Sequence, residues 1–237
     1  MSTYTSYMPQ KSVITMAIDS NGPMKYTKSC LNYRGIEYTC DCNKLRAKFE
    51  LNADVNVARD IVAELILYFY KFEQIYKQLK QCSLKNMCFY AYIGSILSID
   101  FEQEKLRLIK DMRNMGSTIS VDGFYNFCSE QMRENWKSLS QLAYKLYNQC
   151  ENEDDAFELT SFMLSVDGEG VAVIVIENSD PVKLLKNKQP IPVIEIFEKP
   201  EFNIIATILS HRPTNIIVLN PDKLEPALMD AIHSLGE

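Results

Sequence analysis

Glycine and proline are scarce in this sequence, with 8 and 9 copies among 237 residues. So low a content of both leaves little room for long flexible linkers. Long apolar runs are missing too, because the most apolar stretches, 61–70 and 171–176, fall far short of the roughly 20 residues that span a bilayer. The N-terminal segment is polar and lacks the apolar core of a secretory signal. We therefore expect a cytoplasmic protein with no membrane partner.

Sequence motifs of catalysis are also missing. The chain has no glycine-rich phosphate loop and no G-x-S-x-G nucleophile elbow. Histidine, the side chain best suited to proton transfer near neutral pH, occurs only as His211 and His233. His211 stands beside Arg212 at the end of a predicted helix, where a histidine commonly interacts with the helix dipole, and His233 is interpreted as a surface residue. We therefore predict no catalytic residue and no cofactor, and lean towards a protein that is not an enzyme.

The cysteines number seven, and an odd number without a secretory signal argues against a disulfide framework. We therefore expect reduced thiols. Cys30, Cys40 and Cys42 have the spacing C-x9-C-x-C, which lacks the fourth ligand that zinc requires, although folding could add Cys128 or Cys150. Alternate residues of a strand share a face, so C-x-C would place two sulfur atoms together. We predict no metal site from this pattern.

Negative charge dominates the composition, but unevenly. The formal net charge is −6, yet residues 1–150 carry 19 basic and 15 acidic side chains, and residues 151–237 carry 6 and 16. The acidic second half should repel nucleic acid, and the basic excess of the first half is small for its length. The charges therefore favour solvated mixed faces over a nucleic-acid surface.

What the sequence does have is a regular succession of apolar patterns. The first fifty residues predict a small antiparallel sheet, with strands at 12–18, 24–31, 36–39 and 45–51. Apolar residues at helical spacing predict helices at 57–79, 87–99, 100–113, 124–147 and 156–164. Apolar, β-branched runs predict strands at 171–176, 193–197 and 215–219, separated by a loop over 181–190 and followed by helices at 200–209 and 221–235.

These elements define the expected fold class as α+β: a small N-terminal antiparallel sheet, central long helices and a C-terminal β-α-β-α unit. The alternation over 193–235 is typical of parallel strands joined by a right-handed crossover. We divide the chain into an N-terminal β-hairpin and helical region, 1–115, and a C-terminal helical and β-α-β-α region, 116–237.

Two stretches of sequence and the order of elements resemble one known family. The first stretch, 119–136, reads ISVDGFYNFCSEQMRENW, and the second, 207–221, reads TILSHRPTNIIVLNP. Together they resemble the YtxC-like family of sporulation proteins over most of the chain, although residues 1–110 match only in pattern. The chain departs from the family pattern at Cys128, Met132 and Leu219. The resemblance implies a link to endospore formation and no established activity.

The sequence leaves two functional hypotheses. The first is a sporulation-associated protein that acts through contacts with a partner protein, whose identity the sequence does not give. The second is a divergent nucleic-acid-binding or nuclease-like protein, which would require Glu195, Glu198 and Glu201 to face one pocket. The candidates for binding are His211, Arg212 and Asn220. Aromatic residues crowd the central helices, and we interpret them as core or as a protein interface: Phe69, Tyr70, Phe72, Tyr76, Phe89, Tyr90 and Tyr92.

Overall fold

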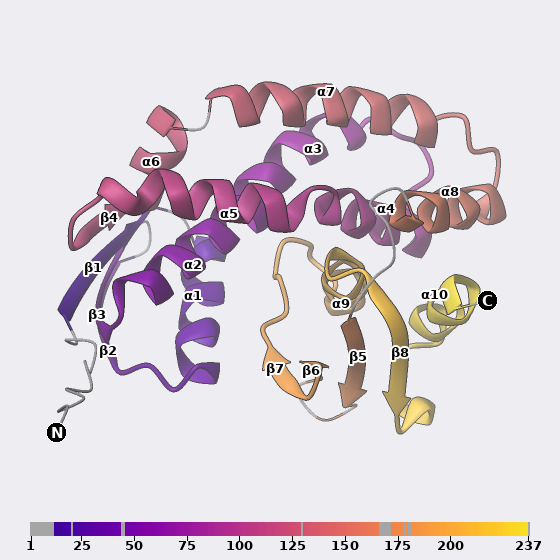
Figure 1. Ribbon diagram of the computed structural model, residues 1–237. Helices are drawn as coiled ribbons and strands as arrows, with labels where there is room; N and C mark the ends of the chain where they lie inside the picture. The colour runs from indigo at the N-terminus through magenta and orange to yellow at the C-terminus, as the bar shows by residue number, and fades with distance from the viewer. Residues whose placement is uncertain are drawn as a thin grey trace, which may run out of the picture.

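Two small sheets lie on either side of a set of packed helices in the computed structural model of the protein (Figure 1). The structure describes residues 12–19, 21–43, 46–128, 130–165, 172–177, 179 and 182–236. The α+β class expected from the sequence is confirmed. None of the helices in this part of the chain has the length and apolar character that crossing a bilayer requires.

The first sheet has the strand order β2-β3-β1-β4. Its strands are β1 (Ser12–Ile18), β2 (Tyr38–Cys42), β3 (Ala47–Ala53) and β4 (Thr118–Ser120). Strands β2, β3 and β1 pair antiparallel, as expected, whereas β4 pairs parallel to β1. Along β3, Phe49 and Leu51 are buried while Lys48 and Glu50 are exposed, which is the period of two of a sheet with one covered face.

The strand predicted at 24–31 is wrong, because these residues lie in helix α1 (Asn21–Tyr33). Met24, Thr27 and Leu31 recur at intervals of three and four and are all buried, which is the spacing of one helix face. The Thr27 hydroxyl donates to the Pro23 carbonyl oxygen, 2.8 Å away, as threonines inside helices often do. The apolar character of this segment therefore serves a buried helix face rather than a strand.

The long helix predicted over 57–79 is confirmed and contains an unexpected feature. Helix α2 (Val55–Leu65) begins after Asp54, whose side chain accepts a hydrogen bond from the Asn56 backbone N–H. It continues into a π-helical segment, η1 (Ile66–Tyr70), and then into α3 (Lys71–Leu79). A π turn adds one residue to the helix and rotates the side chains that follow, and such turns are frequent at functional sites.

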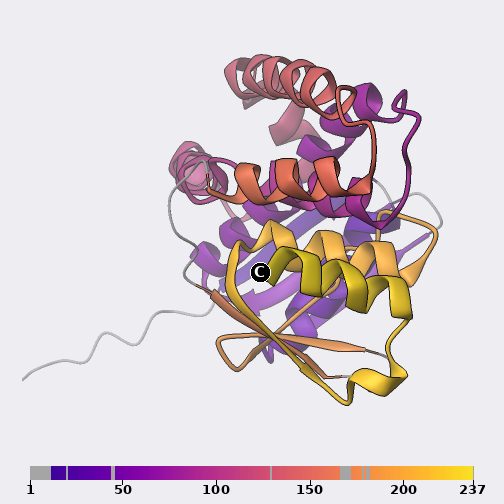
Figure 2. The ribbon, with the colours of Figure 1, turned by 90° about the vertical axis from the view of Figure 1, so that its right-hand side faces the viewer.

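The remaining helices of the central layer are α4 (Met87–Ser98), α5 (Phe101–Asp111), η2 (Met112–Asn114), α6 (Val121–Cys128), α7 (Glu130–Tyr147) and α8 (Glu153–Ser165). The single helix predicted at 124–147 is in fact the pair α6 and α7. Helix α4 packs between α8 and α9, and α7 packs along α3. Figure 2 shows this order of layers, from the second sheet through α9 and α10 to α8 and α7.

The second sheet has the order β7-β6-β5-β8, with β8 parallel to β5. Its elements are β5 (Ala172–Glu177), β6 (Lys183–Lys186), β7 (Gln189–Ile191), α9 (Pro200–Ser210), β8 (Pro213–Leu219), η3 (Pro221–Lys223) and α10 (Pro226–Gly236). The loop predicted over 181–190 therefore contains the β6–β7 hairpin, although residue 181 lies outside the described residues.

The strand predicted at 193–197 is also wrong, and the reason is chemical. The backbone N–H of Ile194 donates to the Thr207 hydroxyl, 2.9 Å away, and the N–H groups of Ile196 and Phe197 donate to Asn203 Oδ1 at 2.9 and 2.8 Å. Because side chains of α9 satisfy these donors, the segment lies against a helix rather than in a sheet. The parallel neighbour of β8 is therefore β5.

The division proposed at residues 115 and 116 stays a prediction. Strand β4, which follows that boundary, is hydrogen-bonded to β1 of the first sheet. The first sheet thus contains residues from both predicted regions.

Candidate functional site

The three binding candidates from the sequence lie at two separate places in the fold. His211 caps the C-terminus of α9, and Arg212 follows it with a positive φ of 47°. Asn220, with φ 56°, stands at the far end of β8. A seven-residue strand separates Arg212 from Asn220, a span of roughly 20 Å at 3.3 Å per residue. Asn220 therefore cannot share a site with His211.

His211 lines a small cavity with a volume of about 80 Å³, which has residues of α1 and α2 on one side and residues 190–192 on the other. Its walls are Tyr26, Cys30, Tyr33, Arg34, Glu64, Pro190, Ile191, Pro192 and His211. The Lys186 ammonium nitrogen lies 3.4 Å from His211 Nδ1, and the ring of Tyr68 meets the imidazole edge-on with centroids 6.0 Å apart. Burial, with the charges of Lys186 and Lys105 adding to it, lowers the pKa of His211 to about 3. The imidazole is therefore neutral at physiological pH.

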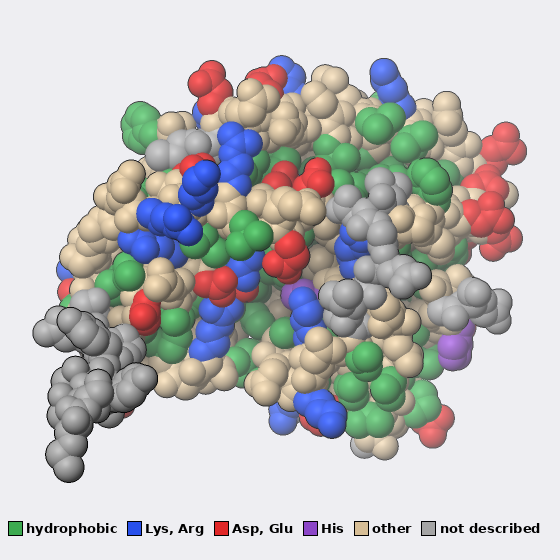
Figure 3. Space-filling view, in the orientation of Figure 1, with side chains coloured by type: hydrophobic (Ala, Val, Ile, Leu, Met, Phe, Trp, Pro, Cys, Tyr) green, Lys and Arg blue, Asp and Glu red, His purple; other side chains and the backbone are tan. Residues whose placement is uncertain are grey.

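Next to this cavity, Arg34, which directly follows α1, forms a closed network with three charged side chains of α2 and α5. Figure 3 shows basic and acidic side chains close together over this part of the molecule. Arg34 contacts Asp60 at 2.7 Å and Glu64 at 3.0 Å, and Lys105 contacts the same two carboxylates at 2.7 and 2.9 Å. Burial acts to raise the pKa of Asp60, but the hydrogen bonds from Lys105 and Arg34 outweigh it and hold that pKa below its usual value. Two cations thus neutralise two anions.

Among the side chains that line this cavity, the Cys30 thiol is the candidate nucleophile. Burial, reinforced by the nearby Glu64 carboxylate, raises the pKa of Cys30 to about 12. A nucleophilic cysteine requires a thiolate at working pH, so Cys30 is not activated. A cavity of 80 Å³ holds a few water molecules, whereas ligand sites usually measure about 300–1,000 Å³. The geometry therefore describes a tightly packed polar junction.

A larger hollow lies around the π-helical segment. We call it the acidic groove; it has a volume of about 360 Å³ and is lined by Pro23, Phe69, Tyr70, Phe72, Glu73, Asp122, Glu195 and Ile196. Phe69 and Tyr70 belong to η1, and Phe72 and Glu73 to the first turn of α3. The groove thus combines an aromatic wall with three carboxylates.

Each carboxylate of the acidic groove comes from a different part of the chain. Asp122 lies in the first turn of α6, where it accepts hydrogen bonds from the Tyr70 hydroxyl and from the Asp19 backbone N–H. Glu195 lies in the segment that the side chains of α9 hold in place, and its Oε2 is 2.8 Å from the ammonium of Lys25. Glu73 is exposed on α3. Burial and the Asp122 carboxylate together raise the pKa of Tyr70, which keeps it a donor.

Sequence reasoning found part of this site and missed the rest. Among the three glutamates named for a nuclease-like pocket, Glu195 lines the groove, whereas Glu198, which is exposed, and Glu201 are both outside its lining. Across the described part of the chain, no three His, Cys, Asp or Glu side chains are grouped to hold a metal ion. Glu73 and Asp122 carried no signal in the sequence, because only the fold brings α3 and α6 together.

The cysteines also differ from expectation. Cys40 and Cys42 form a disulfide, so the prediction of reduced thiols is wrong for this pair. Cys30 is a free thiol buried in α1, and the side chain of Cys128 lies outside the described residues. Free thiols are also present at Cys82, Cys88 and Cys150.

The chain is thus an α+β protein in which a helical layer joins two small sheets. Comparison with protein-family models, with curated proteins and with solved structures gives no significant match.

Proposed function

We propose that this protein acts in the cytoplasm by binding a partner protein, and that the acidic groove receives a basic side chain of that partner. The observation that carries this proposal is the composition of the groove. Glu73, Asp122 and Glu195 supply three carboxylates around one volume of about 360 Å³, and among the described residues that line it there is no lysine or arginine, although Lys25 contacts Glu195 at 2.8 Å. An excess of negative charge in a hollow concentrates cations there.

The aromatic side chains of the groove favour one kind of cation as the ligand. A guanidinium is planar and weakly hydrated, and it stacks on aromatic faces while donating to carboxylates. Tyr70 and Phe72 offer rings beside the carboxylates of Asp122 and Glu73. An arginine side chain of a partner therefore fits the groove better than a phosphate does, which also argues against the alternative of a nucleic-acid-binding or nuclease-like protein.

The sporulation link belongs to the same proposal. The sequence stretch 119–136, which resembles the YtxC-like family, contains α6 and with it Asp122. We place the partner contact at this segment and its cellular role in endospore formation. The polar junction around His211 supports a role without catalysis, since its acids and bases neutralise one another.

A titration calorimetry experiment tests the groove directly. Tetra-arginine peptide should bind the wild-type protein, and tetra-glutamate should not. The variant Glu73→Gln/Glu195→Gln should weaken binding of tetra-arginine at least fivefold, because two of three carboxylates lose their charge. Glu198→Gln is the matched control and should change the affinity less than twofold, since Glu198 is exposed and outside the groove. Equal affinity for the wild type and the double variant would reject the groove as the binding site.

The cellular part has its own test. In an endospore-forming host, a strain that lacks the protein should form fewer spores, and the Glu73→Gln/Glu195→Gln protein should fail to restore them while Glu198→Gln succeeds. Normal spore counts in the deletion strain would reject the sporulation role and leave the calorimetry result standing.

A further inference from the structure

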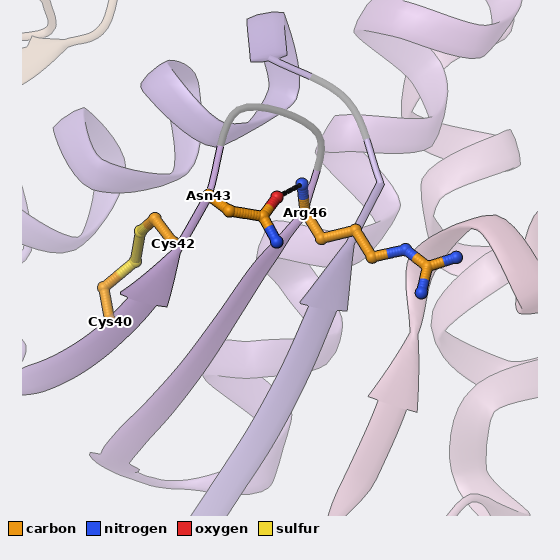
Figure 4. Close-up of a disulfide and its surroundings, with 4 residues drawn as sticks. All are labelled: Cys40, Cys42, Asn43 and Arg46. Carbon is orange, nitrogen blue, oxygen red and sulfur yellow. Dashed lines mark hydrogen bonds between the residues drawn. A yellow bond between two sulfur atoms is a disulfide. The ribbon is translucent and has the colours of Figure 1, made fainter.

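The Cys40–Cys42 disulfide lies at an edge of the first sheet. Strand β2 is the outer strand in the order β2-β3-β1-β4, and Cys42 is its last residue. Figure 4 shows the disulfide close to Asn43 and Arg46, which are hydrogen-bonded to one another between β2 and β3. The Asn43 N–H donates to the Arg46 carbonyl oxygen at 2.9 Å, and the Arg46 N–H donates to Asn43 Oδ1 at 2.8 Å.

The position of this bond makes it a poor structural cross-link. The entropy that a disulfide removes from the unfolded chain grows with the number of residues it encloses, and here the two cysteines are only two positions apart. The hairpin has other supports, because β2 and β3 stay in register from Tyr38↔Leu51 to Cys42↔Ala47. Reduction therefore leaves the β2–β3 hairpin held by its ladder and its turn.

The two cysteine residues differ in exposure. Cys42 is exposed, whereas Cys40 is partly buried against the apolar core that contains its strand partner Phe49. In Figure 4 the Arg46 side chain extends away from the disulfide, towards Asp19, whose Oδ1 it contacts at 3.2 Å. A small thiol thus has an open approach to Cys42, while Cys40 is sheltered as the sulfur that leaves and later closes the bond again.

The free thiols in the rest of the described structure behave differently. Cys30, Cys82 and Cys88 are buried and Cys150 is partly buried, and burial raises the pKa of each. Thiol–disulfide exchange needs an accessible sulfur and a thiolate. Among these cysteines, the Cys40–Cys42 pair on β2 is therefore the most accessible to thiol–disulfide exchange.

We propose that Cys40 and Cys42 form a reversible thiol–disulfide exchange site for small thiols of the glutathione class. The thiolate of one small thiol attacks Cys42 Sγ, a new S–S bond forms, and the electron pair of the broken bond stays on Cys40 Sγ, which takes a proton from water. A second small thiolate attacks the sulfur of the bound small thiol and releases Cys42 as a thiolate. The protein disulfide is reduced to two thiols, and two small thiols are oxidised to one disulfide.

Redox titration of the full chain in glutathione buffers at pH 7 tests this proposal. Samples are quenched in acid, alkylated with N-ethylmaleimide and digested, and the peptide with Cys40 and Cys42 is quantified by mass spectrometry. The oxidised fraction should fall as the ratio of the squared glutathione concentration to the glutathione disulfide concentration rises. Samples that start fully oxidised and samples that start fully reduced should give the same curve. A pair that stays reduced, or stays oxidised, over the whole series would overturn the proposal.

A trapping variant tests the assigned roles of the two sulfur atoms. With glutathione disulfide, Cys40→Ser should accumulate one glutathione adduct on Cys42, because the resolving thiol is gone. Cys150→Ser, which keeps the pair intact, is the matched control and should show no adduct on this peptide. The Cys40→Ser/Cys42→Ser variant should melt within about 3 °C of the wild type. No adduct in Cys40→Ser, or a much larger fall in melting temperature, would show a structural cross-link instead.

Discussion

Replacing the buried lysine of α3 by methionine should destabilise the protein strongly. Lys71 is fully buried, and its ammonium donates to the carbonyl oxygens of Leu97 and Ile99 at 3.3 and 2.6 Å and to Glu104 Oε2 at 2.8 Å. Glu104 in turn accepts from the Trp136 indole N–H at 2.6 Å. Lys71 thus joins α3 to the end of α4 and to α5, and Glu104 extends the connection to α7.

The size of the effect follows from what Lys71→Met leaves behind. Methionine fills a similar volume, so the main loss is electrostatic. Removing one member of a buried ion pair costs about 3–5 kcal/mol, because the other charge stays behind without compensation. The Glu104 side chain is 13% exposed and keeps its bond from Trp136, which places the expected cost near the lower end, about 3 kcal/mol. For a chain of this length that corresponds to a fall in melting temperature of roughly 6–12 °C.

Urea unfolding of a double-mutant cycle measures this cost. Glu104→Gln alone leaves the lysine charge buried, whereas Lys71→Met/Glu104→Gln removes both charges and keeps an acceptor for Trp136. The double variant should therefore lose at least about 1 kcal/mol less than the sum of the single variants. Lys77→Met, an exposed position of the same helix, should change the unfolding free energy by less than about 0.5 kcal/mol. Additive losses, or a Lys71→Met variant as stable as the control, would refute the assigned role of Lys71.

Two further predictions concern packing and pH. A Cβ atom at Gly94 would lie 2.6 Å from the backbone oxygen of Ala206. Gly94→Ala should therefore lower the free energy of unfolding, measured by chemical denaturation, by about 1–3 kcal/mol. Gly116→Ala, where no atom lies within 4 Å of the Cβ, is the control and should not destabilise comparably. The pKa of His211 is about 3 in the folded chain and near 6.5 in the unfolded chain, so the unfolded state binds the extra proton. Stability should therefore fall as pH drops from about 6.5 to 4.5, by up to about 1.4 kcal/mol per pH unit. In His211→Gln that dependence should be weaker; an unchanged dependence would place the imidazole in solvent.

The sequence predicted the elements whose apolar pattern has a single interpretation. Strand β3 alternates strictly, and the helix over 57–79 has a wide apolar face, and both occur as expected. The segment 24–31 failed because its four apolar residues, Met24, Tyr26, Cys30 and Leu31, are mixed with polar ones in a run too short to separate the period of a strand from that of a helix. The segment 193–197 failed for a different reason, since its backbone donors are satisfied by Asn203 and Thr207 of a helix that follows it.

The candidate site was less predictable than the fold. Local pattern cannot show a π turn, which inserts one residue into an otherwise regular helix. The interpretation of Phe69, Tyr70 and Phe72 as core or interface was therefore the limit of what spacing allows. The structure divides them further, because all three line the acidic groove, while Phe69 and Tyr70 also pack against the apolar core around Phe49 and Phe72 packs against the apolar core around Phe89.

The π segment is the point where the two polar regions of the molecule meet. Tyr68 packs its ring against His211 at the junction of the two halves, and Tyr70, two residues later, donates to Asp122 in the acidic groove. Glu195 reaches the same groove from a segment that α9 holds, and His211 caps that same α9. The positions of the groove carboxylates therefore depend on contacts between the N-terminal and C-terminal parts of the chain. A partner that requires all three carboxylates would recognise the assembled fold and not a linear segment, which explains why no short motif in the sequence marks the site.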